Sequence, residues 1–75
     1  MTNPGPIDDV SIGGEMIRLG QFVKFAGLSD SGGTVKEAVA DGDVTVNGEV
    51  EFRRGRQLHP GDVVGFEGRR ARVCP

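Results

Sequence analysis

Three arginines stand within four positions of the segment EFRRGRQLHPGD, residues 51–62. They are Arg53, Arg54 and Arg56. Guanidinium groups match phosphate oxygens two at a time, so a cluster of this kind suits a phosphate-rich polymer. Gly55 between them has no side chain and permits close approach of the backbone to a ligand. The spacing therefore indicates a site for a polyanion.

The same arginines have a second interpretation, a solvated loop held by ion pairs. Nearby carboxylates could neutralise them, at Glu49, Glu51 and Asp62. The whole chain carries a formal net charge of −2, yet its charges are unevenly spread. Residues 1–17 contain three acidic residues and no Lys or Arg, whereas residues 51–75 contain six arginines and three acidic residues. Because local charge decides where a polyanion docks, this gradient favours the first interpretation.

Other kinds of chemistry find little support in the sequence. The single cysteine, Cys74, cannot form an internal disulfide or a cysteine-rich metal site, and it suits a reducing cytoplasm. No apolar run approaches the roughly 18 residues that a membrane span needs. His59 has no nucleophile or carboxylate at a known catalytic spacing. We therefore expect a cytoplasmic protein without membrane association, metal, cofactor or enzymatic activity.

Helical periodicity occurs twice in the first half of the chain. Apolar residues recur at helical spacing over residues 19–26, and Gly27 is expected to end this helix. A second helix is expected over residues 32–41, with Asp30 or Ser31 as N-cap and Gly42 just after the end. The chain is expected to begin with a flexible tail over residues 1–10, because this segment is rich in Pro and Gly and poor in apolar residues.

The apolar pattern changes to a period of two from residue 44. Asn47-Gly48 predicts a tight hairpin, and Gly68 is expected at the centre of a second hairpin over residues 63–73. The expected fold is α+β, with two short N-terminal helices packed on a small twisted antiparallel sheet. Residues 11–75 would form this single domain, and the lack of a long surplus apolar stripe favours a monomer.

The order of these segments resembles the alpha-L RNA-binding motif family, named after a domain of the fourth small-subunit ribosomal protein. The matching elements are Arg18-Leu19, Ser31, the run from Gly42 to Gly48, and Pro60-Gly61-Asp62. They cover about residues 17–66 in order, and the chain looks most similar to the short stand-alone YbcJ-like bacterial branch. Gly20, Gly32 and Glu49 depart from the family pattern, since an aspartate, an arginine and a lysine are common there.

The resemblance implies that RNA lies across the two helices and the following hairpin loop. The RNA-binding residues that the resemblance implies are Arg18, Gln21, Ser31, Lys36 and Asn47. The residues themselves add Lys24 on the polar face of the first helix, Gly32 and Gly33 at the start of the second, and Arg53, Arg54 and Arg56 in the loop. Free backbone amides of Ser31, Gly32 and Gly33, at the start of the second helix, are candidates for binding a phosphate.

The four phenylalanines (Phe22, Phe25, Phe52 and Phe66) mostly occupy core positions of the predicted elements, with partial exposure left open for Phe25 or Phe52. This favours recognition of backbone and shape over base stacking. The leading hypothesis is a non-enzymatic protein that binds structured RNA, rRNA or tRNA, with ribosomal particles as a further partner. The alternative is a protein-interaction module whose arginines pair with an acidic partner.

Overall fold

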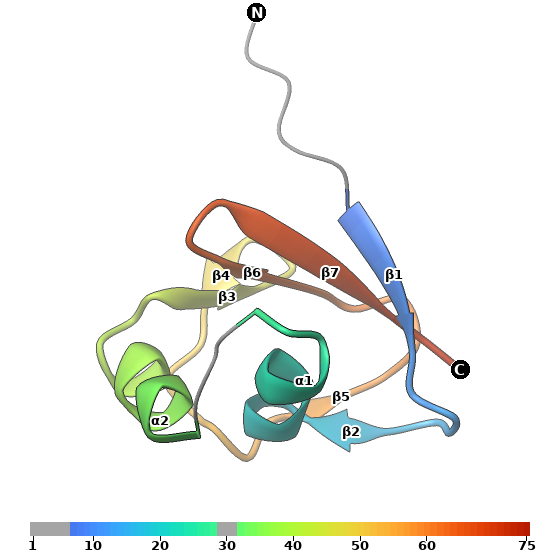
Figure 1. Cartoon of the computed structure of the whole chain (residues 1–75), viewed down its shortest axis with the longest axis horizontal. Coiled ribbons are helices and arrows are strands. Elements are labelled where there is room, and N and C mark those ends of the chain that lie inside the picture. Colours follow the sequence, from blue (N-terminus) through green and yellow to red (C-terminus); the bar gives the residue numbers. More distant parts are fainter. Residues whose placement is uncertain (1–6, 29–31) are drawn as a thin grey trace, which may run out of the picture.

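The computed structural model describes residues 7–28 and 32–75. Strands and helices follow one another in the order β1 (Ile7–Ser11), β2 (Ile17–Arg18), α1 (Leu19–Phe25), α2 (Gly32–Ala40), β3 (Val44–Val46), β4 (Glu49–Val50), β5 (Gln57–Leu58), β6 (Val63–Phe66) and β7 (Arg69–Cys74). The larger sheet has the strand order β1-β7-β6-β3-β4, and β2 pairs with β5 in a small second sheet. Figure 1 shows both helices on one side of the larger sheet. The α+β class is confirmed.

Both helices end as their glycines predict. The amide of Gly27 donates to Lys24 O and that of Leu28 to Val23 O, which is the Schellman pattern of bonds. The second helix ends in the same way, because Gly42 donates to Val39 O and Asp43 to Ala38 O. Gly27 and Gly42 have φ of +73° and +79°, a left-handed conformation that favours glycine.

The two predicted hairpins are present. Asn47 and Gly48 join β3 to β4 with φ of 53° and 86°, and Glu67 and Gly68 join β6 to β7 with φ of 51° and 78°. Two consecutive positive φ values are typical of the type I′ turn, whose twist matches that of paired strands. The strand patterns then place alternate apolar side chains of β3, β6 and β7 in the core.

The core lies between the larger sheet and the helices. Its buried members are Leu19, Phe22, Val23, Leu28, Val35, Ala38, Val39, Val44, Val46, Leu58, Val64, Phe66, Ala71 and Val73. They come from both helices, from Leu28 in the turn after α1, and from β3, β5, β6 and β7, so one continuous core fixes the helices on the sheet. No helix in the described part of the chain is long and apolar enough to cross a membrane.

Two sequence expectations are corrected by the strands. Residues 7–10 belong to β1 and are not part of a tail, because β1 pairs in parallel with β7 from Ile7↔Arg70 to Ser11↔Cys74. The larger sheet is therefore mixed, and two strands precede the helices. β5 (Gln57–Leu58), which the sequence did not predict, follows the arginine segment and pairs with Arg18 and Ile17 of β2.

Candidate nucleic-acid interface

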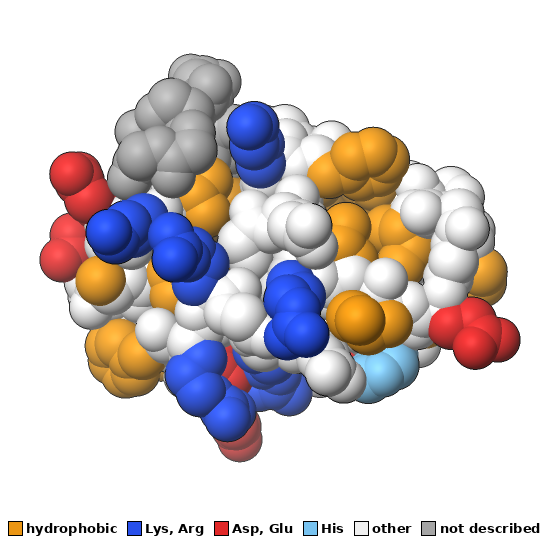
Figure 2. Space-filling model, turned by 90° about the horizontal axis from the view of Figure 1, so that it is seen from below, with side chains coloured by type: hydrophobic (Ala, Val, Ile, Leu, Met, Phe, Trp, Pro, Cys, Tyr) orange, Lys and Arg blue, Asp and Glu red, His pale blue; other side chains and the backbone are white. Residues whose placement is uncertain are grey.

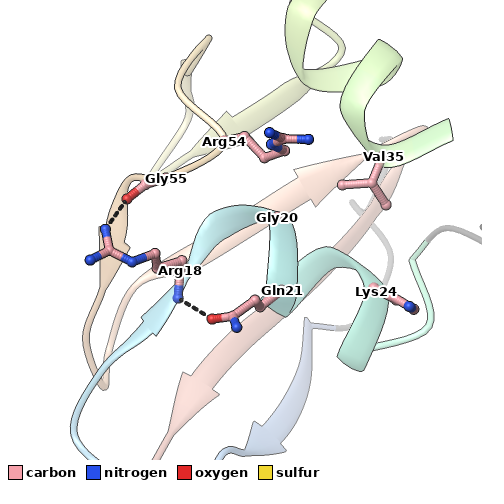
Figure 3. Close-up of a pocket in the computed structure, with 7 residues that line it drawn as sticks. All are labelled: Arg18, Gly20, Gln21, Lys24, Val35, Arg54 and Gly55. Atoms are coloured by element: carbon pink, nitrogen blue, oxygen red, sulfur yellow. Dashed lines mark hydrogen bonds between the residues drawn. The ribbon is translucent and has the colours of Figure 1, made fainter. Parts of the chain in front are cut away.

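A groove of about 470 Å³ opens where the start of α1, the side of α2 and the loop after β4 meet. Its lining residues are Arg18, Gly20, Gln21, Lys24, Val35, Arg54 and Gly55 (Figure 3). Three of these residues are cations, and they come from segments that are distant in the sequence. Figure 2 shows that Lys and Arg side chains gather on this face of the molecule, with Asp and Glu mostly at its margin.

Arg18 stands at the junction of β2 and α1. It holds in place the loop of residues 51–56 between β4 and β5, called the arginine loop below. Its Nη1 donates a hydrogen bond of 2.8 Å to the carbonyl of Gly55. Its backbone amide points to Gln21 Oε1 at 3.4 Å, so the Gln21 side chain helps to cap the first turn of α1 (Figure 3). Arg18 and Gln21 therefore shape the groove as well as line it.

Backbone bonds attach the arginine loop to the start of α1. The amide of Leu19 donates to Arg56 O at 2.8 Å, and the amide of Gly20 donates to Arg54 O at 2.9 Å. The first amides of a helix have no partner within it, so these loop carbonyls satisfy two of them. The loop is thereby fixed on the helix through two of its three arginines.

The absence of a side chain at Gly20 makes room for Arg54. A Cβ atom at Gly20 would lie 3.2 Å from Arg54 Cδ and only 2.5 Å from Arg54 Cγ, and the second distance is closer than two carbon atoms can approach. The stem of Arg54 therefore lies across the first turn of α1, and its guanidinium extends toward α2 near Val35 (Figure 3). Arg54 has no ion-pair partner among the described residues.

Arg53 and Arg56 both form ion pairs with Glu51, as expected for a solvated loop held by ion pairs. Arg53 Nε lies 3.2 Å from Glu51 Oε2, and Arg56 Nη1 lies 2.9 Å from Glu51 Oε1. The Glu51 side chain is only 9% exposed, whereas that of Arg53 is 78% exposed. Hydrogen bonds from the Arg53 side chain, then from Arg56 and the Arg53 amide, lower the pKa of Glu51 to about 2. Glu51 is thus ionised at neutral pH and fixes the loop.

The two predicted lysines differ in position. Lys24 lies on the exposed face of α1 and lines the groove. Lys36 is exposed on α2 but is not a lining residue. Gly32 and Gly33 form the first turn of α2, while Ser31 and the predicted N-cap lie outside the described residues.

Asn47 is engaged within the protein and lies outside the groove. Its Nδ2 donates to Asp62 Oδ1 at 3.1 Å, and its Oδ1 accepts from the Val63 amide at 3.0 Å. Both functional ends of the side chain are therefore occupied. The structure gives Asn47 a role in joining two turns, which the spacing of the motif alone did not reveal.

The expectation that the phenylalanines lie mostly in the core holds for two of the four, and the exposure left open for Phe25 or Phe52 is found at both. Phe22 and Phe66 are buried, but Phe25 is 61% and Phe52 is 64% exposed. Sequence reasoning also missed Gly20 as a site residue. Its departure from the family pattern was the available signal, because a glycine at the start of a helix often marks a close approach of backbone or side chain.

The site holds no grouping typical of a metal centre. Among residues 7–28 and 32–75, no three His, Cys, Asp or Glu side chains come together in a way that could hold a metal ion. The chemistry available in the groove is that of cationic donors, two guanidinium groups and one ammonium group. These groups bind anions and phosphate oxygens in particular.

Comparison with known protein families identifies the family of this chain. A family model described as the S4 domain matches residues 10–74, which is most of the chain. The chain belongs to the S4 domain family. The matched range includes β3–β7, both helices and every described groove residue.

Individual relatives narrow the placement within the S4 domain family. A Bacillus subtilis (strain 168) protein described as "Probable ribosome maturation protein RlbA" is 48% identical over 68 residues, 91% of this chain and 89% of that protein. An Escherichia coli (strain K12) protein described as "Putative RNA-binding protein YbcJ" is 37% identical over 57 residues, 76% of this chain and 81% of that protein.

A solved structure extends the similarity to the fold. The solution structure of YbcJ from E. coli, described as an "alfaL motif involved in RNA-binding", matches with a TM-score of 0.69 and 30% identity. The match covers 100% of this chain and 96% of that one. The resemblance to the alpha-L motif and to its YbcJ-like branch is therefore confirmed.

Proposed function

We propose that this S4 domain protein is a non-enzymatic RNA-binding protein that holds backbone phosphates in the groove between α1, α2 and the arginine loop. The observation that carries the proposal is the convergence of Arg18, Lys24 and Arg54 on one groove. Cations gathered in a concave site strengthen the local positive potential, which attracts a polyanion even though the whole chain is slightly acidic.

The three cations would have different roles. Arg54 presents a planar guanidinium that can bind one phosphate through two nitrogens. Lys24 supplies a compact charge on a flexible stem at the other side of the groove. Arg18 uses one nitrogen on Gly55 O, which leaves its remaining donors for RNA. These contacts read phosphate positions and carry no direct base specificity.

Among RNA classes we favour ribosomal RNA. The relative with 48% identity is described as a ribosome maturation protein, and the YbcJ relative as RNA-binding. A groove that binds phosphates in a fixed geometry suits folded RNA, in which neighbouring backbones keep a defined spacing. The proposed ligand is therefore rRNA in ribosomal particles, ahead of tRNA, with the protein acting in the cytoplasm.

Substitution of Arg54 tests the groove directly. Arg54→Ala should weaken binding to a fragment of rRNA and reduce the slope of log affinity against log salt by roughly 0.7–0.9, the value for one lost phosphate contact. Arg69→Ala is the matched control, since it removes the same charge from an exposed position in β7 that does not line the groove. Equal losses in the two variants would mean that general charge, and not the groove, governs binding.

The identity of the partner needs a second experiment. Purification of the tagged protein from cells, followed by sequencing of the RNA that accompanies it, should enrich rRNA over tRNA. The Arg54→Ala variant should lose this enrichment. Recovery of an acidic protein without RNA above background would instead favour a protein-docking module.

A further inference from the structure

Phe52 is the most exposed of the large apolar side chains in the described part of the chain. It is 64% exposed, and the others are Met16 at 44%, Phe25 at 61% and Val50 at 51%. Its chain neighbours are the buried Glu51 and the exposed Arg53. We infer that Phe52 is a stacking platform for an unpaired base of the bound RNA. The inference rests on the proposed function, because it assigns a second contact to the same ligand.

The ring of Phe52 is supported from one side. A Cβ atom at Gly42 would lie 3.1 Å from Phe52 Cε1 and 3.3 Å from its Cζ, with Val50 Cγ1 at 3.4 Å. The ring therefore lies against the backbone of Gly42, whose φ of +79° belongs to the C-terminal turn of α2. This contact restricts the ring on one side, so Phe52 loses less conformational freedom when a base stacks on it than an unsupported ring would.

Phe52 and Arg54 lie along the same helix. Phe52 lies against Gly42, just after the end of α2. Arg54 extends to Val35 near the start of α2 (Figure 3). The two positions of α2 are separated by a distance on the order of 10 Å at the rise of an α-helix. One short stretch of single-stranded RNA can therefore place a phosphate at Arg54 and a nearby base at Phe52.

The charges around Phe52 favour a base over a phosphate. Asp41 and Asp43 flank Gly42 and are both exposed, so they repel phosphates from this end of α2. A base is neutral, and its exocyclic amino groups can donate hydrogen bonds to carboxylates. The neighbouring arginines meanwhile hold the backbone of the same strand. With carboxylates near Phe52 and cations in the groove, a bound RNA strand would turn a base toward Phe52 and its phosphates toward the groove.

An affinity comparison separates stacking from phosphate binding. Phe52→Ala should weaken binding to a short single-stranded oligoadenylate by roughly 5-fold to 140-fold, which corresponds to the loss of one stacked base. It should leave both the salt slope and the affinity for a short RNA duplex unchanged, because duplex bases are not available for stacking. Phe25→Ala removes an equally exposed ring on α1 and serves as the control. An unchanged affinity of Phe52→Ala for the single strand would overturn the inference.

A fluorescent probe gives a readout that does not depend on affinity. The chain contains no Trp or Tyr, so Phe52→Trp introduces a single indole. Saturating oligoadenylate should quench this indole, whereas the duplex should not, and the indole of Phe25→Trp should respond to neither. Equal quenching at both positions, or no quenching at position 52 under saturation, would overturn the inference. If Arg54→Ala weakens RNA binding while the substitutions of Phe52 show no effect, the proposed function stands without the stacking site. If the unmodified protein does not bind RNA, both the proposed function and the stacking site are wrong.

Discussion

The side-chain amide of Asn47 donates a hydrogen bond of 3.1 Å to Asp62 and thereby joins the β3–β4 turn to the turn that precedes β6. Asp62 also accepts the amide of His59 at 2.8 Å, which closes its own turn. Asn-Gly and Pro-Gly-Asp are separate motifs in the sequence, but in the fold they form one hydrogen-bonded unit.

This unit predicts a structural role for Asn47 that can be separated from RNA binding. Asn47→Gly keeps the positive φ of the turn but removes both side-chain hydrogen bonds, so the free energy of unfolding should fall by about 1–2 kcal/mol. Urea unfolding measures this loss. Affinity for RNA, measured under conditions in which the variant is fully folded, should stay unchanged. A variant with normal stability and weaker RNA binding would instead support the prediction that Asn47 contacts RNA.

Ionisation of Glu51 makes stability depend on pH. Its pKa is lowered from 4.5 to about 2, so the stabilisation by its arginine bonds is complete above the higher value and is lost as the pH falls through about 2. The melting temperatures of the unmodified protein and of Glu51→Gln should therefore differ at neutral pH and converge between about pH 4.5 and 2. A constant difference across this range would contradict the assignment.

The same substitution should release two arginines to the ligand. In Glu51→Gln the guanidinium groups of Arg53 and Arg56 lose their carboxylate and can bind phosphates. The salt slope of RNA binding should become steeper by roughly 0.7–0.9 for each additional phosphate that the loop neutralises. Glu49→Gln is the control, since it makes the same charge change at an exposed position with no ion pair to an arginine in the described structure. Equal slopes in the two variants would show that only net charge matters.

Gly20 should matter for binding more than for stability. A methyl group in Gly20→Ala would displace the Arg54 stem, with Cγ only 2.5 Å from the new Cβ, and would turn its guanidinium away from the groove. Alanine has a better helix propensity than glycine by roughly 1 kcal/mol, which offsets the cost of moving a flexible side chain. We expect unfolding close to that of the unmodified protein and RNA affinity close to that of Arg54→Ala. Full affinity in Gly20→Ala would show that the position of Arg54 is unimportant.

The protein should be a monomer at micromolar concentration. Val50 and Phe52 form a small exposed apolar patch beside Gly42, but two side chains fall far short of the roughly 800 Å² per partner that a stable interface buries. Sedimentation velocity measures the oligomeric state. A stable dimer that Phe52→Ala dissolves would identify this patch as a self-association surface.

Local patterns in the sequence were enough to predict both helices and both tight hairpins. Gly27, Gly42 and Asn47-Gly48 carry conformational preferences of their own, so their neighbours have little influence on them. Pairing between distant segments was not predictable in the same way. β1 contains two aspartates and looks polar, yet it pairs with β7 at the other end of the chain. Its register depends on backbone bonds to that strand and not on its own composition.

The candidate site shows the same division. The spacing of the arginines indicated the cluster. It could not show that Arg54 lines the groove while Arg53 and Arg56 pair with Glu51. The difference arises from burial of Glu51 and from the space above Gly20, and both depend on how β4, β5 and α1 meet. The sequence left open which of Phe25 and Phe52 is exposed, and the assembled fold exposes both.

The bonds from Leu19 and Gly20 to the loop carbonyls restrict how this loop can evolve. Arg54 O and Arg56 O accept the first amides of α1 from fixed positions in the loop. An insertion or deletion between them would shift one carbonyl out of reach and leave a helical amide without its partner. These two backbone bonds do not use the side chains of the loop, so a substitution at constant length leaves both bonds in place. Related proteins that bind different RNAs from this face are therefore expected to diversify the loop by substitution, with its length preserved.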